Sequence, residues 1–301
     1  MRTIATVFMK SVTPQPIEGL SSDRKPRPVK IIRPVSFSPV GLFRELRGLW
    51  QYRDLFYTLT VHRIKVRYKQ SVLGLAWAIL QPLSLMLIYT VIFSVIAKVP
   101  SENVPYAVFA YAALLPWTFF SSALTNATTS LVSHSQLVTK VYFAREILPL
   151  TYVSAAVFDF AVASSFLIAL FFYYRVGLTV YALYAVPIFL LLAALATAFS
   201  LFLSAVQVRF RDIGVAMPLL LQVWLFATPV VYPLSAVPLR FRGIYALNPT
   251  VGVIENFRRV VLQGVAPDFN SLAISAIAAA ILFPLAYLYF KRVEATMADI
   301  I

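Results

Sequence analysis

The sequence contains no cysteine, which excludes disulfide bonds, thiolate metal sites and cysteine nucleophiles. None of its nine glycines is followed by lysine, so the G-x-x-x-x-G-K-[ST] loop that holds nucleotide phosphates is absent. The two histidines, His62 and His134, lack metal-ligand spacing, and no Ser/His/Asp set can be argued. We therefore expect no enzyme activity, metal or cofactor in this chain. Any ATP and Mg²⁺ would be bound by a partner subunit.

Charge is also scarce. Only 13% of the 301 residues are charged and 60% are hydrophobic, with a mean hydropathy of +0.80, whereas ordinary soluble domains are roughly 25% charged. A formal net charge of +14 would suggest a nucleic-acid partner in a soluble protein. In so apolar a chain it indicates anionic membrane lipid instead, and no nucleic acid is expected.

Long apolar runs are what the chain has in abundance. A transmembrane helix needs about 20 apolar residues to cross the roughly 30 Å hydrocarbon core. Six segments are near or above that length, at about residues 72–97, 106–132, 148–173, 178–206, 213–233 and 270–290. The predicted fold class is an all-α membrane protein with six transmembrane helices.

Two regions precede the first apolar run. Residues 1–35 are rich in Pro, Ser, Arg and Lys, a composition that buries too little apolar area to offset chain entropy, which predicts a mobile basic tail. In residues 36–70, Ser38 and Pro39 can begin an amphipathic helix of the kind that lies in the membrane interface. Residues 71–295 form the predicted transmembrane domain.

Basic residues are distributed unevenly between the connections. Twenty of the 26 Lys and Arg residues fall before residue 71, in the 134–147 and 207–212 loops, and at the C-terminus, all on one side of the predicted bundle. The positive-inside rule places this side, with both termini, in the cytoplasm. The other six basic residues are Lys98, Arg175, Arg240, Arg242, Arg258 and Arg259.

The cytoplasmic stretch SQLVTKVYFARE, residues 135–146, is too short and too charged to cross a membrane, yet its apolar residues repeat at helical spacing. We expect a short helix on the membrane surface. Lys140 and Arg145 would then contact a partner protein or, equally, lie in a solvated loop.

The external connection before the last span is rich in proline. Asn248 can cap a helix and Pro249 can start one, with an apolar stripe opposite Glu255, Arg258 and Arg259. This pattern predicts a pair of short re-entrant or interfacial helices, which are tolerated at membrane depth only where protein or a water-filled cavity covers their backbone.

Asp159 is the single acidic residue inside a predicted span. An ionisable group there is costly and points to a functional site. One carboxylate without a second acid or histidine makes a poor proton relay, however. A structural bond to a Ser, Thr or Tyr on a neighbouring helix is the favoured interpretation.

Aromatic residues make up 15% of the chain, and most are expected at the two membrane interfaces. Those in the second and fifth spans could instead line a passage for an amphipathic polymer, because the rings offer an apolar face and, in Tyr and Trp, a polar edge. The candidates are Tyr106, Tyr111, Trp117, Phe119, Phe120, Trp224, Phe226 and Tyr232.

The run IKVRYKQSVLGLAWAILQPLSLMLIYTVIF, residues 64–93, resembles the opening of the type-2 ABC exporter permeases that move lipid-linked polysaccharides such as O-antigen, capsule and teichoic acid. The resemblance covers most of the chain from about residue 40. It includes the segments LPWTFFSSAL, KVYFAREILPL, VRFRDIG and LNPTVGVIENFRRVVL. The chain looks most similar to the O-antigen permeases of this family.

The resemblance implies a homodimer of six-helix permeases that forms one continuous channel in the bacterial inner membrane, above two copies of an ABC ATPase. The substrate would be a lipid-linked glycan of the kind made in lipopolysaccharide biosynthesis. Ser38 to about Thr60 would be the interface helix, and the aromatic residues of the spans would contact sugar rings.

The resemblance also implies roles for two sets of residues. The coupling helix that docks on the ATPase would include Gln136, Lys140, Tyr142, Arg145 and Glu146. The external gate helices, at about 234–264, would include Asn248, Glu255, Phe257, Arg258 and Arg259. From charge and location alone, Lys65, Arg67 and Lys69 are candidates for attracting a lipid pyrophosphate, with a membrane-surface role as the alternative.

Other functions stay open. The same fold could export a small lipophilic compound. A membrane-embedded glycosyltransferase would need acidic residues clustered at one interface, and the sequence has only scattered ones. A passive channel or scaffold is the third alternative.

Overall fold

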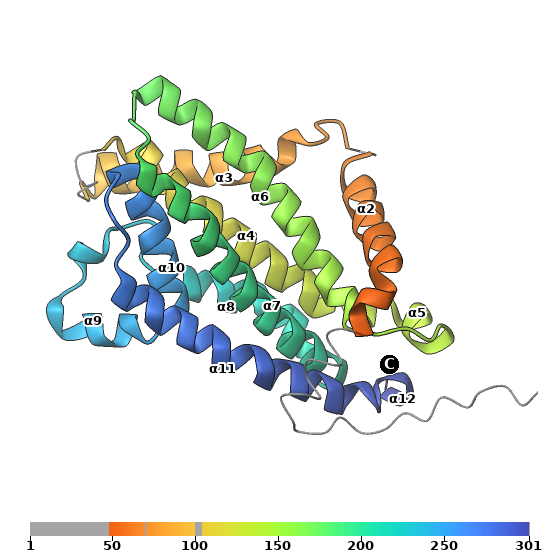
Figure 1. The fold of residues 1–301 in the computed structure, drawn as a ribbon. Helices are drawn as coiled ribbons and strands as arrows, with labels where there is room; N and C mark the ends of the chain where they lie inside the picture. Colours follow the sequence, from red (N-terminus) through yellow and green to blue (C-terminus); the bar gives the residue numbers. More distant parts are fainter. Residues whose placement is uncertain (1–47, 70, 100–103, 301) are drawn as a thin grey trace, which may run out of the picture. The chain divides into compact units, whose positions relative to one another are not determined.

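The computed structural model describes residues 48–69, 71–99 and 104–300, and every regular element in these ranges is a helix (Figure 1). The all-α prediction is confirmed for these residues. The predicted mobile tail and the start of the interface helix fall within residues 1–47, outside the described part. The elements are η1 (Trp50–Tyr52), α2 (Arg53–Lys69), α3 (Ala76–Tyr89), η2 (Thr90–Ile96), α4 (Tyr106–Ser133), α5 (Ser135–Lys140), α6 (Ile147–Tyr174), η3 (Val180–Tyr184), α7 (Ala185–Arg209), α8 (Asp212–Phe226), η4 (Leu234–Ala236), α9 (Leu239–Ala246), α10 (Pro249–Arg258), η5 (Arg259–Gln263), α11 (Phe269–Glu294) and α12 (Met297–Ile300).

Five helical segments have the length and composition to cross a membrane: Ala76–Ile96, Tyr106–Ser133, Ile147–Tyr174, Val180–Arg209 and Phe269–Glu294. They match five of the six predicted spans to within a few residues. The predicted span at 213–233 is instead α8, a helix of 15 residues. At about 1.5 Å per residue it covers roughly 22 Å, less than the hydrocarbon core.

Helix α4 occupies the centre of the described bundle, in contact with α3, α6, α7, α8 and α10 (Figure 1). Almost all of its apolar side chains are buried. Alanines at positions 110, 112, 113, 123 and 127 of α4 have no exposed surface, and such small side chains allow neighbouring helices to approach closely. The interior of the described bundle is therefore filled by side chains around α4.

Helix α8 ends at Phe226, shortly before Pro229, because a proline lacks an amide donor and keeps the residue before it out of the helical region. Side chains of α4 and of the α10 region bond to the carbonyls of the irregular segment that follows. The bonds are Asn248 Nδ2 to Ala227 O (3.2 Å), Arg258 Nη1 to Pro229 O (3.3 Å) and Tyr106 Oη to Val231 O (2.5 Å). These protein groups bond to carbonyls that the end of the helix leaves without helical partners.

The two short helices expected before the last span are present as α9 and α10. Asn248 caps α10 by accepting a hydrogen bond from the Thr250 amide at 3.1 Å, and Pro249 is its first residue. Gly252 allows the close packing of α10 on α11, since a Cβ there would lie 2.5 Å from the Ser271 carbonyl oxygen.

The predicted surface helix at 135–146 is half as long as expected. Helix α5 ends at Lys140, and Val141 is extended (φ −122°, ψ 133°). Val141 and Tyr142 are exposed, whereas Phe143 turns into a buried cluster. Helical spacing predicted a helix through residue 146. Arg145 and Glu146 bond to α11 instead, and the chain leaves the helical conformation at Val141.

Candidate functional site

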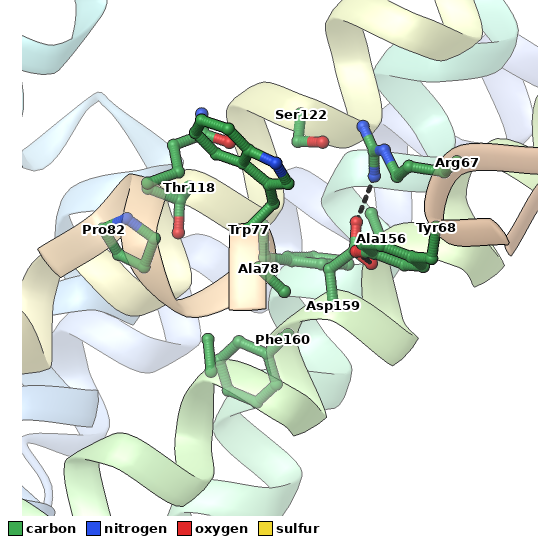
Figure 2. A pocket seen from close by; sticks show the side chains of 13 residues that line it. Arg67, Tyr68, Trp77, Ala78, Pro82, Thr118, Ser122, Ala156, Asp159 and Phe160 are labelled. Carbon is green, nitrogen blue, oxygen red and sulfur yellow. Dashed lines mark hydrogen bonds and ion pairs between the residues drawn. The ribbon is translucent and has the colours of Figure 1, made fainter. Parts of the chain in front are cut away.

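Asp159 on α6 meets two side chains from the C-terminal end of α2. Its carboxylate oxygens accept hydrogen bonds from Arg67 Nη1 and Tyr68 Oη (Figure 2). Tyr68 is the kind of structural partner expected for this carboxylate, while the ion pair with Arg67 was not anticipated. Burial raises the pKa of Tyr68, and the bond to Asp159 adds to the rise, so its hydroxyl stays protonated and donates.

A first cavity of about 210 Å³ lies beside this ion pair (Figure 2). Apart from Arg67 and Asp159 its lining is uncharged and combines hydroxyl and amide groups with aromatic rings. The polar and aromatic lining residues are Arg67, Tyr68, Trp77, Gln81, Thr118, Phe119, Ser122, Asp159 and Phe160. Such a lining suits a neutral group with a polar edge and an apolar face.

A second cavity, of about 270 Å³, shares Arg67, Ser122 and Asp159 with the first. It has a basic lining, because two arginines stand against a single carboxylate. The polar and aromatic lining residues are His62, Arg63, Arg67, Ser122, Asn126, His134, Tyr152 and Asp159. The lining comes from α2, α4 and α6 and includes His134, which follows α4 directly.

Arg63 is fixed in the second cavity by two contacts with α6. Its Nε donates to Thr151 Oγ1 at 2.6 Å, and its guanidinium carbon lies 3.5 Å from the centroid of the Tyr152 ring. Its Nη2 is buried and has no hydrogen-bond partner among the described residues. Burial lowers the pKa of Arg63, although an arginine stays cationic near neutrality. The Arg63 guanidinium is thus a cation in a fixed position, and its Nη2 has no acceptor among the described residues.

The structure divides the basic residues of α2 between two faces. Arg63 and Arg67 are four residues apart, share a face and line the second cavity. Lys65 and Lys69 are exposed and are not among the lining residues of either cavity. Sequence reasoning on charge alone grouped Lys65, Arg67 and Lys69 and missed Arg63. The four-residue spacing was the signal that could have found it.

Comparison with known proteins gives the family. The sequence profile of the ABC-2 type transporter family matches residues 54–262. The chain belongs to this family. It is 30% identical over 256 residues to an O-antigen export system permease protein RfbA of Myxococcus xanthus, covering 84% of this chain and 98% of that protein. It is also 29% identical over 249 residues to an RfbA protein of Klebsiella pneumoniae, covering 82% and 95% of the two chains.

The residues predicted to couple this ABC-2 transporter to an ATPase separate into two groups. Gln136, Lys140 and Tyr142 are exposed on or just after α5. Arg145 and Glu146 are engaged with α11 instead. The Arg145 backbone amide donates to Glu294 Oε1 at 3.1 Å, and its side chain bonds to the Glu294 carbonyl.

Most of the aromatic residues predicted to line a channel in the ABC-2 transporter lie inside the helix bundle of the single chain. Those of α4 are buried, and their rings pack against α6, α7 and α8. The buried set is Tyr106, Tyr111, Trp117, Phe119 and Phe120. In this arrangement they contact neighbouring helices, and Phe119 also lines the first cavity. Trp224 and Tyr232 are partly exposed and Phe226 is exposed, so these three keep access to a surface.

The residues predicted for the external gate lie on α10 and its ends. Phe257 is buried, as the apolar stripe predicted, but Arg258 is buried too, with 1% of its surface exposed. The expectation that Arg258 lies opposite the stripe is wrong. Its guanidinium pairs with Glu255 one turn earlier on α10 and stacks 4.0 Å from the Phe109 ring centroid, a contact that the packing on α4 provides. Arg259 is exposed and donates to the Ala266 carbonyl at 2.8 Å.

Proposed function

We propose that this chain is the membrane-spanning permease of an ATP-driven exporter that moves a lipid-linked polysaccharide of the O-antigen type across the bacterial inner membrane. The observation that carries the proposal is the similarity over 84% of the chain to a relative named as an O-antigen export system permease. Family membership and five long apolar helices agree with a transport subunit.

ATP would be hydrolysed by a separate ABC ATPase, present in two copies. The proposal is supported by the sequence, in which no glycine is followed by the lysine of a phosphate-binding loop. Exposed Gln136, Lys140 and Tyr142 give the ATPase a contact surface at α5. This end of the molecule also holds α12, which contacts α5.

The passage would form between two copies of the chain. The centre of one protomer is filled around α4, so a wide passage through a single copy has no room. The α3–η2 segment exposes apolar side chains that need lipid or a second copy to cover them: Leu87, Ile88, Val91, Val95 and Ile96. Trp224, Phe226 and Tyr232 are the aromatic residues that could meet sugar rings at such an interface.

We further propose that α8 and the irregular segment after it complete a sixth crossing. Both termini would then be cytoplasmic, as the excess of basic residues on that side favours. The side-chain bonds to the carbonyls of Ala227, Pro229 and Val231 support such a crossing, because they allow irregular backbone at membrane depth. Helices α9 and α10 would lie at the external end as gate elements.

The test is reconstitution. The chain is purified in mild detergent, copurifying proteins and lipids are identified by mass spectrometry, and the complex is placed in proteoliposomes loaded with lipid-linked glycan. We expect an ABC ATPase to copurify and ATP to drive glycan movement. A complex that moves none of the glycan but moves a small lipophilic compound would replace this proposal with the alternative exporter.

A further inference from the structure

We propose that the basic cavity between α2, α4 and α6, centred on Arg63, binds the phosphate of an anionic lipid headgroup. The identity of that lipid as the polyprenyl pyrophosphate carrier rests on the proposed function. The phosphate site itself rests on the geometry of the cavity.

Arg63 holds a hydrogen-bond donor that no described residue uses. Arg63 is held by Thr151 and by the Tyr152 ring, which fixes its position before any ligand arrives. Its buried Nη2 has no partner among the described residues. Leaving a buried donor of a charged group unpaired costs free energy that a bound acceptor would recover. A phosphate oxygen is an acceptor that matches the guanidinium in geometry and charge.

The charge balance of the lining also favours an anion. Two arginines, Arg63 and Arg67, face the cavity with Asp159 as the single carboxylate. Arg67 is already paired with Asp159, so Arg63 is the cation left to hold an anion. A volume of about 270 Å³ accommodates a phosphate or pyrophosphate with ordered water.

The first cavity does not attract an anion. Arg67 and Asp159 line both cavities and are paired with each other. The lining of the first cavity has no other charged group, so it offers an anion no unpaired cation. A headgroup phosphate would therefore stay beside Arg63, and neutral parts of the same ligand could enter the first cavity.

The experiment measures binding of a polyprenyl pyrophosphate to the full-length protein by native mass spectrometry, over a range of lipid concentrations. Arg63→Gln removes the cation, and Arg63→Lys keeps the positive charge but lacks the paired N–H donors of the guanidinium. Lys65→Gln removes a positive charge from the exposed face of α2. We expect Arg63→Gln to weaken binding about tenfold or more, Arg63→Lys to fall between, and Lys65→Gln to change it by less than about twofold.

Two results would overturn the site: Arg63→Gln binding as tightly as the wild type, or Lys65→Gln losing as much as Arg63→Gln, which would mean diffuse attraction only. Melting temperatures and gel-filtration profiles show whether each variant folds. If Arg63→Gln fails to fold, Arg63→Lys is compared with the wild type and with Lys65→Gln instead.

Parallel titrations with phosphatidylglycerol and inorganic pyrophosphate separate the possible sources of the phosphate. If phosphatidylglycerol binds as tightly as the polyprenyl pyrophosphate and its binding also depends on Arg63, the cavity is a lipid-phosphate site that is not specific for the carrier. Binding of inorganic pyrophosphate alone would overturn the lipid assignment. If wild-type proteoliposomes move no glycan while Arg63-dependent binding persists, the proposed function fails and the phosphate site stands.

Discussion

Lys291 Nζ lies 2.7 Å from Glu146 Oε1, so a buried ion pair joins the chain just before α6 to the C-terminal end of α11. The two side chains expose 9% and 1% of their surface. Tyr287 donates to the same Glu146 oxygen at 3.3 Å, and Glu294 accepts from Lys291 at 2.8 Å. Burial raises the pKa of Glu146, which the nearby lysine opposes. This pair ties the connection between α5 and α6 to the C-terminal end of α11.

Replacing Lys291 by Met should destabilise the protein by about 3 kcal/mol, because Glu146 is left as a buried, uncompensated charge. Thermal unfolding in detergent measures the change. The double variant Glu146→Gln with Lys291→Met should recover most of the loss, since it removes both charges. If the double variant loses as much free energy of unfolding as the two single variants lose together, the pairing is contradicted.

Lys140→Ala should reduce copurification of the ATPase. It should change the free energy of unfolding by no more than about 0.5 kcal/mol, as a neutral surface substitution does. Lys140 is exposed at the end of α5. Arg209→Ala, which removes an exposed cation from the end of α7, is the matched control and should leave ATPase recovery unchanged. Equal recovery with both variants would remove α5 from the contact surface.

Tyr68→Phe should cost roughly 1.5–3 kcal/mol, the range for a hydrogen bond to a charged group, because Asp159 loses its hydroxyl partner. Tyr57→Phe, on the same helix with 69% of its surface exposed, is the control and should be near neutral. Combined with Asp159→Asn, the Tyr68 substitution should cost less than it does alone. Strict additivity in this double-mutant cycle would mean that the two groups do not interact in solution.

Arg258→Lys should destabilise the protein by about 2 kcal/mol or more despite the retained charge. A lysine cannot stack on Phe109 and at the same time reach Glu255 and the Pro229 carbonyl. The neighbouring Arg259→Lys, on the exposed side of the helix, is the matched control. Equal melting temperatures for the two variants would show that the buried guanidinium geometry is unimportant.

Stability should fall as the pH drops below about 6.5. Burial lowers the pKa of His134, and the positive charge of Arg63 adds to the effect. In the window below its ordinary pKa near 6.5, the unfolded chain binds a proton at His134 that the folded chain does not, so acid favours unfolding there. Melting temperatures measured from pH 8 to pH 5 check this slope. His134→Gln should flatten it, and an unchanged slope would assign the effect to other groups.

The local features of the chain were predictable because short-range physics determines them. Apolar length alone located five long helices to within a few residues, and Asn248 followed by Pro249 predicted the start of α10. Helical spacing was less reliable at residues 135–146. There the chain leaves the helix at Val141 because Arg145 and Glu146 bond to α11, a helix about 150 residues away that no local pattern reveals.

The sequence by itself determined that the chain is an apolar helical membrane protein without a nucleotide-binding loop, since composition and segment length decide solubility in lipid. Only the tertiary structure decided which side chains face one another. It placed Arg63 over Tyr152, buried Arg258 against Phe109 and filled the centre of the helix bundle with the aromatic residues of α4. The reason is that hydrophobic burial depends on the amount of apolar surface, whereas ion pairs and stacked rings require particular atoms within a few ångströms of each other.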